Sequence, residues 1–144
     1  MERDAGFDIR RFLQAQERTY AQTIAELRAG RKRTHWMWFV FPQRVGLGHS
    51  AMSRRFGISG LDEAGAYLAH PVLGARLREC SNVVAASTVS AHDLFGSPDD
   101  LKLRSCMTLF DAAGDDPCFR AVLASKFDSA PCSRTLELLD APRR

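Results

Sequence analysis

Apolar residues recur at three- and four-residue steps along most of the chain. The first such stretch runs from Phe7 to Ala29 and predicts one long helix, with Asp8 as its N-cap and Gly30 just after its end. Charged residues fall mostly on the opposite side of this helix, where we expect them to face solvent. The apolar stripe consists of Ile9, Phe12, Leu13, Tyr20, Ile24 and Leu27, and the charged side of Arg10, Arg11, Glu17, Arg18 and Glu26.

A wholly apolar run follows, from Trp36 to Phe41. Its length fits either a buried strand or a short buried helix, and periodicity cannot distinguish between the two. Pro42 disfavours helical angles at the residue before it, so the run should end there. Gly46 and Gly48 then indicate a tight loop.

Start and stop signals divide the remaining sequence into short helices, and no alternating pattern or hairpin signal indicates paired strands. The predicted fold is therefore all-α: a compact multihelical single domain of about seven or eight helices over residues 1–144. These later helices are expected from Ser50 to Phe56, Leu61 to Ala69, Pro71 to Ala86 and Ser90 to Phe95, and then from starts near Ser97–Pro98, Asp115 and Ser133.

Composition narrows the class of protein. A chain of 144 residues with 45% hydrophobic content suits a globular domain. No apolar run approaches the roughly 18 residues of a membrane span, and the charged N-terminus does not resemble a signal peptide, so we expect a cytoplasmic protein that makes no membrane contact. The net charge of +3 gathers partly in the run 31–33, which favours an anionic small molecule over nucleic acid as the partner.

The four cysteines are too widely spaced for a typical zinc site, because no C-x-x-C pair occurs. We therefore predict free thiols, no bound metal and no cofactor. The cysteines are Cys80, Cys106, Cys118 and Cys132.

Candidate chemistry gathers around the apolar run. His35 has a side chain suited to general acid or base catalysis, although the commoner role for such a residue is structural, to cap a helix or bond a core carbonyl. Trp36 and Trp38 could stack on a base-like ring, or fill the core. Gln43, just before the glycine loop, is well placed to pair with a ligand's donors and acceptors.

The glycine loop and two cations suggest an anion site. Gly46, Gly48 and Ser50 lead into a helix, so their backbone N–H groups could hold a phosphate or carboxylate; the alternative is a turn followed by an N-cap. The segment lacks the P-loop pattern. Arg33 and Lys102 would hold the phosphate. Ser105 lies three residues after Lys102 on one helix, and we favour ligand binding over a nucleophile–base pair for these two side chains.

The sequence resembles a bacterial family of domains of unknown function, some of whose members are labelled calpastatin-like. The resemblance covers nearly the whole chain and implies a multihelical fold but no established activity. The family pattern has a serine near the position of Cys106, which argues against a catalytic role for that side chain. Four segments carry the resemblance: R-K-R-T-H-W-M-W-F-V-F-P-Q (31–43), G-L-G-H-S (46–50), A-Y-L-A-H-P-V-L-G-A-R-L (66–77) and D-D-L-K-L-R-S-C-M-T-L-F (99–110).

Two functions remain open from the sequence. The first is binding, or also hydrolysis, of a phosphorylated nucleotide-like small molecule at the segment His35–Ser50. The second is a non-enzymatic protein-interaction or regulatory module, which requires a tryptophan exposed in an apolar patch. The sequence indicates neither whether the protein is an enzyme nor its oligomeric state.

Overall fold

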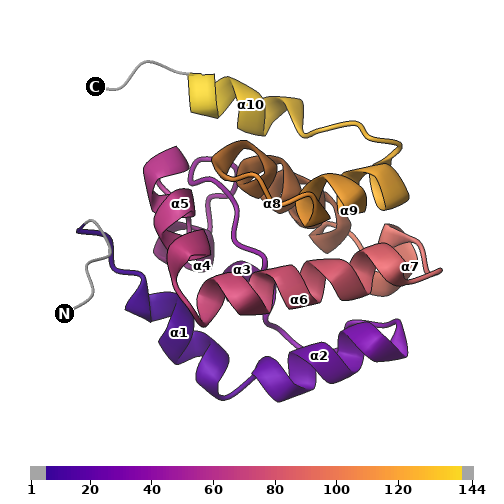
Figure 1. Ribbon diagram of the computed structural model, residues 1–144. Coiled ribbons are helices and arrows are strands. Elements are labelled where there is room, and N and C mark those ends of the chain that lie inside the picture. Colours follow the sequence, from indigo (N-terminus) through magenta and orange to yellow (C-terminus); the bar gives the residue numbers. More distant parts are fainter. Residues whose placement is uncertain (1–5, 141–144) are drawn as a thin grey trace.

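The computed structural model describes residues 6–140, and within them the regular structure consists of α-helices (Figure 1). The only β-type pairing in this range is a single parallel bridge between Arg44 and Ile58. The predicted all-α fold is confirmed. The ten helices are α1 (Arg10–Glu17), α2 (Tyr20–Ala29), α3 (Met37–Val40), α4 (Ala51–Arg55), α5 (Leu61–Ala69), α6 (Leu73–Ala86), α7 (Ala91–Phe95), α8 (Asp99–Ala113), α9 (Cys118–Phe127) and α10 (Ser133–Asp140).

The helix count exceeds the prediction for two reasons: the apolar run after residue 35 forms the short helix α3, and the stretch from Phe7 to Ala29 forms two helices rather than one. The chain turns at Arg18 and Thr19, and α1 then packs against α3 while α2 packs against α6. A straight helix could not reach both partners. The hydroxyl of Thr19 also bonds the carbonyl of Ala15 (3.2 Å), a local bond that competes with continued helix.

Helix α8 lies at the centre of the core. Residues 105–110 are all buried, and the helix packs against α5, α7, α9 and α10 (Figure 1). A helix that is surrounded in this way needs apolar side chains on nearly every face. Across residues 6–140, no helix is both long enough and apolar enough to cross a membrane.

Several predicted helix ends are confirmed. Ser50 and Ser90 cap α4 and α7, each hydroxyl accepting the N–H of the residue three positions later (both 3.1 Å). Gly30 ends α2 in a left-handed conformation with φ 81°. Asp8, in contrast, is not the cap of α1, because the helix begins one residue later and Ile9 takes that position.

Candidate functional site

The segment before α3 is fixed to α2 by one buried carboxylate. Glu26 is 3% exposed, and its oxygens accept bonds from Gln22 Nε2, the N–H groups of Arg33 and Thr34, the Thr34 hydroxyl and Trp36 Nε1, at 2.7–3.0 Å. Burial by itself raises the pKa of a carboxyl group, but these donors outweigh it and lower the pKa of Glu26 to about 2. The sequence prediction of a solvent-facing Glu26 was wrong.

This anchor places Trp36 in the core. Its side chain is fully buried, and its ring packs against Phe41 and Phe95 with centroids 6.1 and 6.2 Å away. Trp36 therefore cannot stack on a ligand, contrary to one of the two sequence interpretations. The side chains of Arg33 and His35 are exposed, and neither lines the pocket described below.

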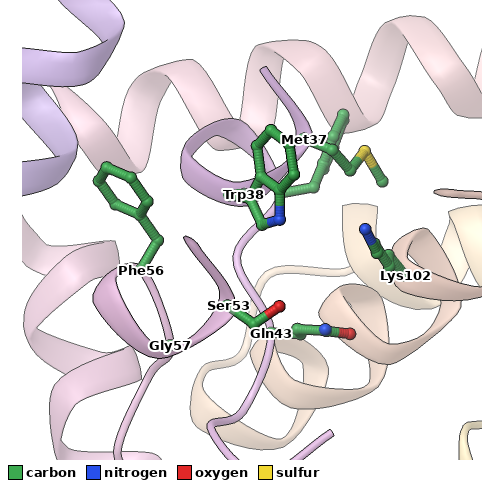
Figure 2. A pocket seen from close by; sticks show the side chains of 8 residues that line it. Met37, Trp38, Gln43, Ser53, Phe56, Gly57 and Lys102 are labelled. Atoms are coloured by element: carbon green, nitrogen blue, oxygen red, sulfur yellow. The ribbon is translucent and has the colours of Figure 1, made fainter. Parts of the chain in front are cut away.

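Trp38, two residues after Trp36, is only partly buried and borders a pocket (Figure 2). About 250 Å³ of space lies between the lining side chains when open solvent is included, but the cavity itself is only about 10 Å³, room for roughly one water molecule. Its walls are mostly apolar, with polar groups from three different parts of the chain. The lining residues are Met37, Trp38, Phe41, Gln43, Ser53, Phe56, Gly57 and Lys102.

The polar groups at this pocket are available to a ligand. Within residues 6–140, neither the indole N–H of Trp38 nor the side-chain amide of Gln43 has a hydrogen-bond partner. Ser53 Oγ accepts a hydrogen bond from Ser50 Oγ (2.9 Å), which leaves its own O–H free to donate. Figure 2 shows the Trp38 nitrogen, the Ser53 hydroxyl and the ends of Gln43 and Lys102 around one space.

Lys102 brings positive charge to the pocket. Its ammonium group lies 5.3 Å from the Trp38 ring centroid and 3.3 Å from Asp99 Oδ1. The other oxygen of Asp99 pairs with Lys32 at 3.0 Å, and Lys32 lies 5.3 Å from the ring centroid of Trp36. Two ammonium groups thus share one carboxylate, and the cluster carries one net positive charge. Such a charge attracts an anion to the mouth of the pocket.

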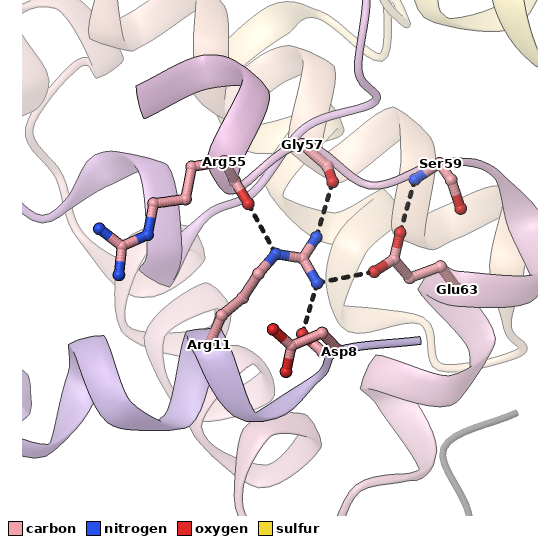
Figure 3. Close-up of polar contacts among 6 residues, drawn as sticks. All are labelled: Asp8, Arg11, Arg55, Gly57, Ser59 and Glu63. Atoms are coloured by element: carbon pink, nitrogen blue, oxygen red, sulfur yellow. Dashed lines mark hydrogen bonds and ion pairs between the residues drawn. The ribbon is translucent and has the colours of Figure 1, made fainter. Parts of the chain in front are cut away.

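Arg11 positions the part of the pocket wall that contains Phe56 and Gly57 (Figure 3). Its guanidinium donates to the carbonyls of Arg55 (2.6 Å) and Gly57 (2.8 Å), on either side of the pocket residue Phe56. Arg11 also pairs with Glu63 at 3.0 Å, and Glu63 is 4% exposed. This buried ion pair ties α1, α5 and the end of α4 together, so it holds the Phe56 ring against the pocket.

The glycine loop supports the pocket without lining it. Gly46 has φ 103°, a conformation that favours glycine, and Gly48 lies so close to α4 that a Cβ would come within 2.5 Å of Ser53 Oγ. The N–H of Ser53 is already bonded to Ser50 Oγ, so this donor is not free for an anion. The geometry therefore favours the turn and N-cap over the predicted anion cradle.

Ser105 faces away from Lys102. Its side chain is 7% exposed, and its hydroxyl bonds the carbonyl of Leu101 (3.1 Å) and lies 3.3 Å from Cys132 Sγ. A hydroxyl held there cannot act with Lys102 on one ligand, so the two side chains do not form the predicted pair.

Three predicted residues thus converge on one pocket: Trp38, Gln43 and Lys102. Ser50 acts behind them, through Ser53. Sequence reasoning missed Ser53, although its spacing of three residues from the N-cap Ser50 could have indicated a hydroxyl on the loop side of a short helix.

Comparison with known proteins places the chain in a family. The crystal structure of the conserved hypothetical protein Rv1873 from Mycobacterium tuberculosis superposes with a TM-score of 0.92 at 51% sequence identity, covering 94% of this chain and 99% of that one. No curated protein sequence matches the chain. Residues 6–139 match the family described as "Protein of unknown function (DUF1810)", and the chain therefore belongs to the DUF1810 family.

Proposed function

We propose that the protein binds a small planar molecule with an acidic group, nucleotide-like in combining a ring with a phosphate, in the pocket beside Trp38. One observation carries this proposal. The unpaired N–H of Trp38, the unpaired amide of Gln43 and the ammonium group of Lys102 meet around an apolar space. Ligand sites typically combine apolar walls with a few convergent polar groups of this kind.

Each group suits one part of such a ligand. The ring would lie against Phe41 and Phe56, because aromatic faces pack well on one another. The phosphate would pair with Lys102, whose partner Asp99 is shared with a second lysine and so does not fully offset its charge. The amide of Gln43 can donate and accept at the same time, which suits the edge of a heterocycle.

The size of the pocket limits what enters it. Its cavity volume of about 10 Å³ is far below the ~300–1,000 Å³ of typical small-molecule sites. A ring therefore enters only if the side chains of Trp38, Gln43 and Lys102 move apart, with the rest of the ligand at the open mouth. Within the described chain, no carboxylate, imidazole or thiol lines the pocket, so its residues favour binding over hydrolysis.

The test is a thermal-shift screen of mononucleotides and sugar phosphates, followed by calorimetry on any compound that raises the melting temperature. Lys102→Met should weaken binding at least tenfold, because an ion-paired hydrogen bond contributes roughly 1.5–3 kcal/mol. Arg31→Met is the matched control, since it removes an equal charge from an exposed side chain that neither lines the pocket nor pairs with Asp99. The proposal fails if no compound stabilises the protein at millimolar concentration, or if both variants weaken binding equally.

The partial exposure of Trp38 also fits the second candidate, a non-enzymatic protein-interaction or regulatory module. In that case an apolar side chain of a partner protein would enter the pocket. Trp38→Ala would then abolish the complex, while Lys102→Met would leave it largely intact. A phosphate ligand, in contrast, would depend strongly on Lys102.

A further inference from the structure

Cys132 differs from the other three cysteines in its surroundings. Cys80, Cys106 and Cys118 are buried, whereas Cys132 is partly exposed where α10 begins. Burial raises the pKa of the Cys80 and Cys118 thiols to about 12 and also raises that of Cys106. These three thiols are therefore protonated at neutral pH and inert.

The sulfur of Cys132 is surrounded by hydrogen-bond donors. The carbonyl of Cys132 accepts the N–H of Leu136 (3.2 Å), which places Cys132 at the N-cap of α10. The Ser105 hydroxyl lies 3.3 Å from its sulfur, and the first-turn N–H groups of Arg134 and Thr135 favour the charged form of the thiol. The single Ser105 proton is shared between the Leu101 carbonyl and this sulfur, and a thiolate, which is a much stronger acceptor than a neutral thiol, would draw it toward the sulfur.

Thr135 adds a buried hydroxyl at the same place. Its side chain is fully buried, and within residues 6–140 its hydroxyl has no hydrogen-bond partner of ordinary geometry, although it faces the Cys132 sulfur. A buried hydroxyl without a partner costs free energy, which an anionic sulfur beside it would recover. Partial burial opposes ionisation of Cys132, but the donors from Ser105, Thr135 and Arg134 outweigh it, so the pKa of Cys132 lies below its ordinary value.

We propose that Cys132 is a modification site that forms mixed disulfides with low-molecular-weight disulfides. The thiol loses its proton to solvent, and the thiolate attacks one sulfur of the small disulfide. A bond forms between Cys132 Sγ and that sulfur as the original S–S bond breaks. The leaving thiolate departs with the electron pair and takes up a proton from solvent, so the exchange needs no further oxidant.

The experiment treats the native protein with glutathione disulfide at pH 7 and locates the adduct by peptide mass spectrometry. The adduct should form on Cys132 about tenfold or more faster than on the three buried cysteines. An adduct spread over the other cysteines, or absent from Cys132, would overturn the proposal.

The pH dependence of iodoacetamide alkylation shows whether Cys132 reacts because its thiolate is stabilised or only because its side chain is accessible. The midpoint for Cys132 in the native protein should lie below that of the same cysteine in the urea-unfolded chain; an equal or higher midpoint contradicts the proposal. Ser105→Ala and Thr135→Val should each raise the native midpoint and slow alkylation at pH 7 about threefold. The rate falls less than the thiolate fraction does, because a thiolate of higher pKa is a stronger nucleophile.

Thr23→Val is the matched control, because Thr23 is the other fully buried threonine whose hydroxyl lacks a partner in the described chain, and it is not among the groups that face Cys132. This variant should leave the Cys132 midpoint unchanged. If Thr135→Val does not fold, the outcome rests on Ser105→Ala, whose failure to move the midpoint would contradict the assigned role of the donors.

Discussion

Trp36 and Trp38 are two residues apart and meet opposite surroundings. Trp36 is sealed in the core with its N–H bonded to Glu26, whereas Trp38 is partly exposed with no hydrogen-bond partner for its N–H within residues 6–140. Each ring has a lysine ammonium 5.3 Å from its centroid, Lys32 beside Trp36 and Lys102 beside Trp38. The two tryptophans therefore differ in exposure and in whether the indole N–H is already bonded. Trp36 is structural on both counts, whereas Trp38 is available to a ligand.

This contrast follows from the short helix α3. Its turn sends Trp36 and Trp38 to different sides, one toward Phe95 and the other toward Lys102. An apolar run read as a strand would have put both side chains on the same face, because strand side chains alternate with a period of two. The choice between helix and strand thus decides which tryptophan can reach a ligand.

The largest predicted effect is on the core side of this pair. Trp36→Ala should lower the free energy of unfolding by about 3–5 kcal/mol, because it leaves a cavity and deprives Glu26 of a donor. Trp38→Ala should cost about 1 kcal/mol, since its ring is already partly in solvent. Urea unfolding followed by far-UV circular dichroism measures both. Equal losses for the two variants would contradict the division of roles.

Glu26→Gln should have the next largest effect, about 2–3 kcal/mol at pH 7, because an amide cannot accept all the bonds that this buried carboxylate accepts. Glu17→Gln is the control: it makes the same substitution at an exposed position on α1 and should change stability by less than ~0.5 kcal/mol.

The pH dependence of stability tests the same carboxylate. Its folded pKa of about 2 lies below the ordinary value of 4.5, so its contribution is fully present above about pH 4.5 and is lost as the pH falls toward 2. The shift corresponds to roughly 3 kcal/mol. Glu26→Gln should therefore flatten the decline of stability over this range relative to wild type. An unchanged slope in urea titrations at pH 5 and pH 2.5 would show that Glu26 is not the group responsible.

Local signals in the sequence were sufficient to predict much of the fold. Gly30, Ser50 and Ser90 act through neighbours within a few residues, so their roles could be predicted from spacing alone. The turn at Arg18 could not, because the apolar stripe continues across it and only the packing partners of α1 and α2 require it. Glu26 was misassigned for the same reason: its donors come from a later loop that folds back onto α2.

The candidate site was predicted in part. Trp38 and Gln43 lie within one unusual segment, and Lys102 stood out as a cation on an amphipathic helix, yet only the fold brings α8 to α3. His35 was singled out for its chemistry, but its side chain is exposed and does not line the pocket. Residue type indicates what a side chain can do, whereas its direction depends on contacts that are distant in sequence.

The smallest predicted effect concerns two serine caps with the same local role. Ser50→Ala and Ser90→Ala should each lower the free energy of unfolding by about 1 kcal/mol, since each hydroxyl accepts one first-turn N–H. Only Ser50 also donates to Ser53 Oγ at the pocket, so only Ser50→Ala should weaken binding of a ligand found in the nucleotide screen, by about threefold. Calorimetry on both variants measures this difference. Equal weakening by Ser90→Ala would mean that lost helix stability, and not the orientation of Ser53, controls the affinity of the Trp38 pocket.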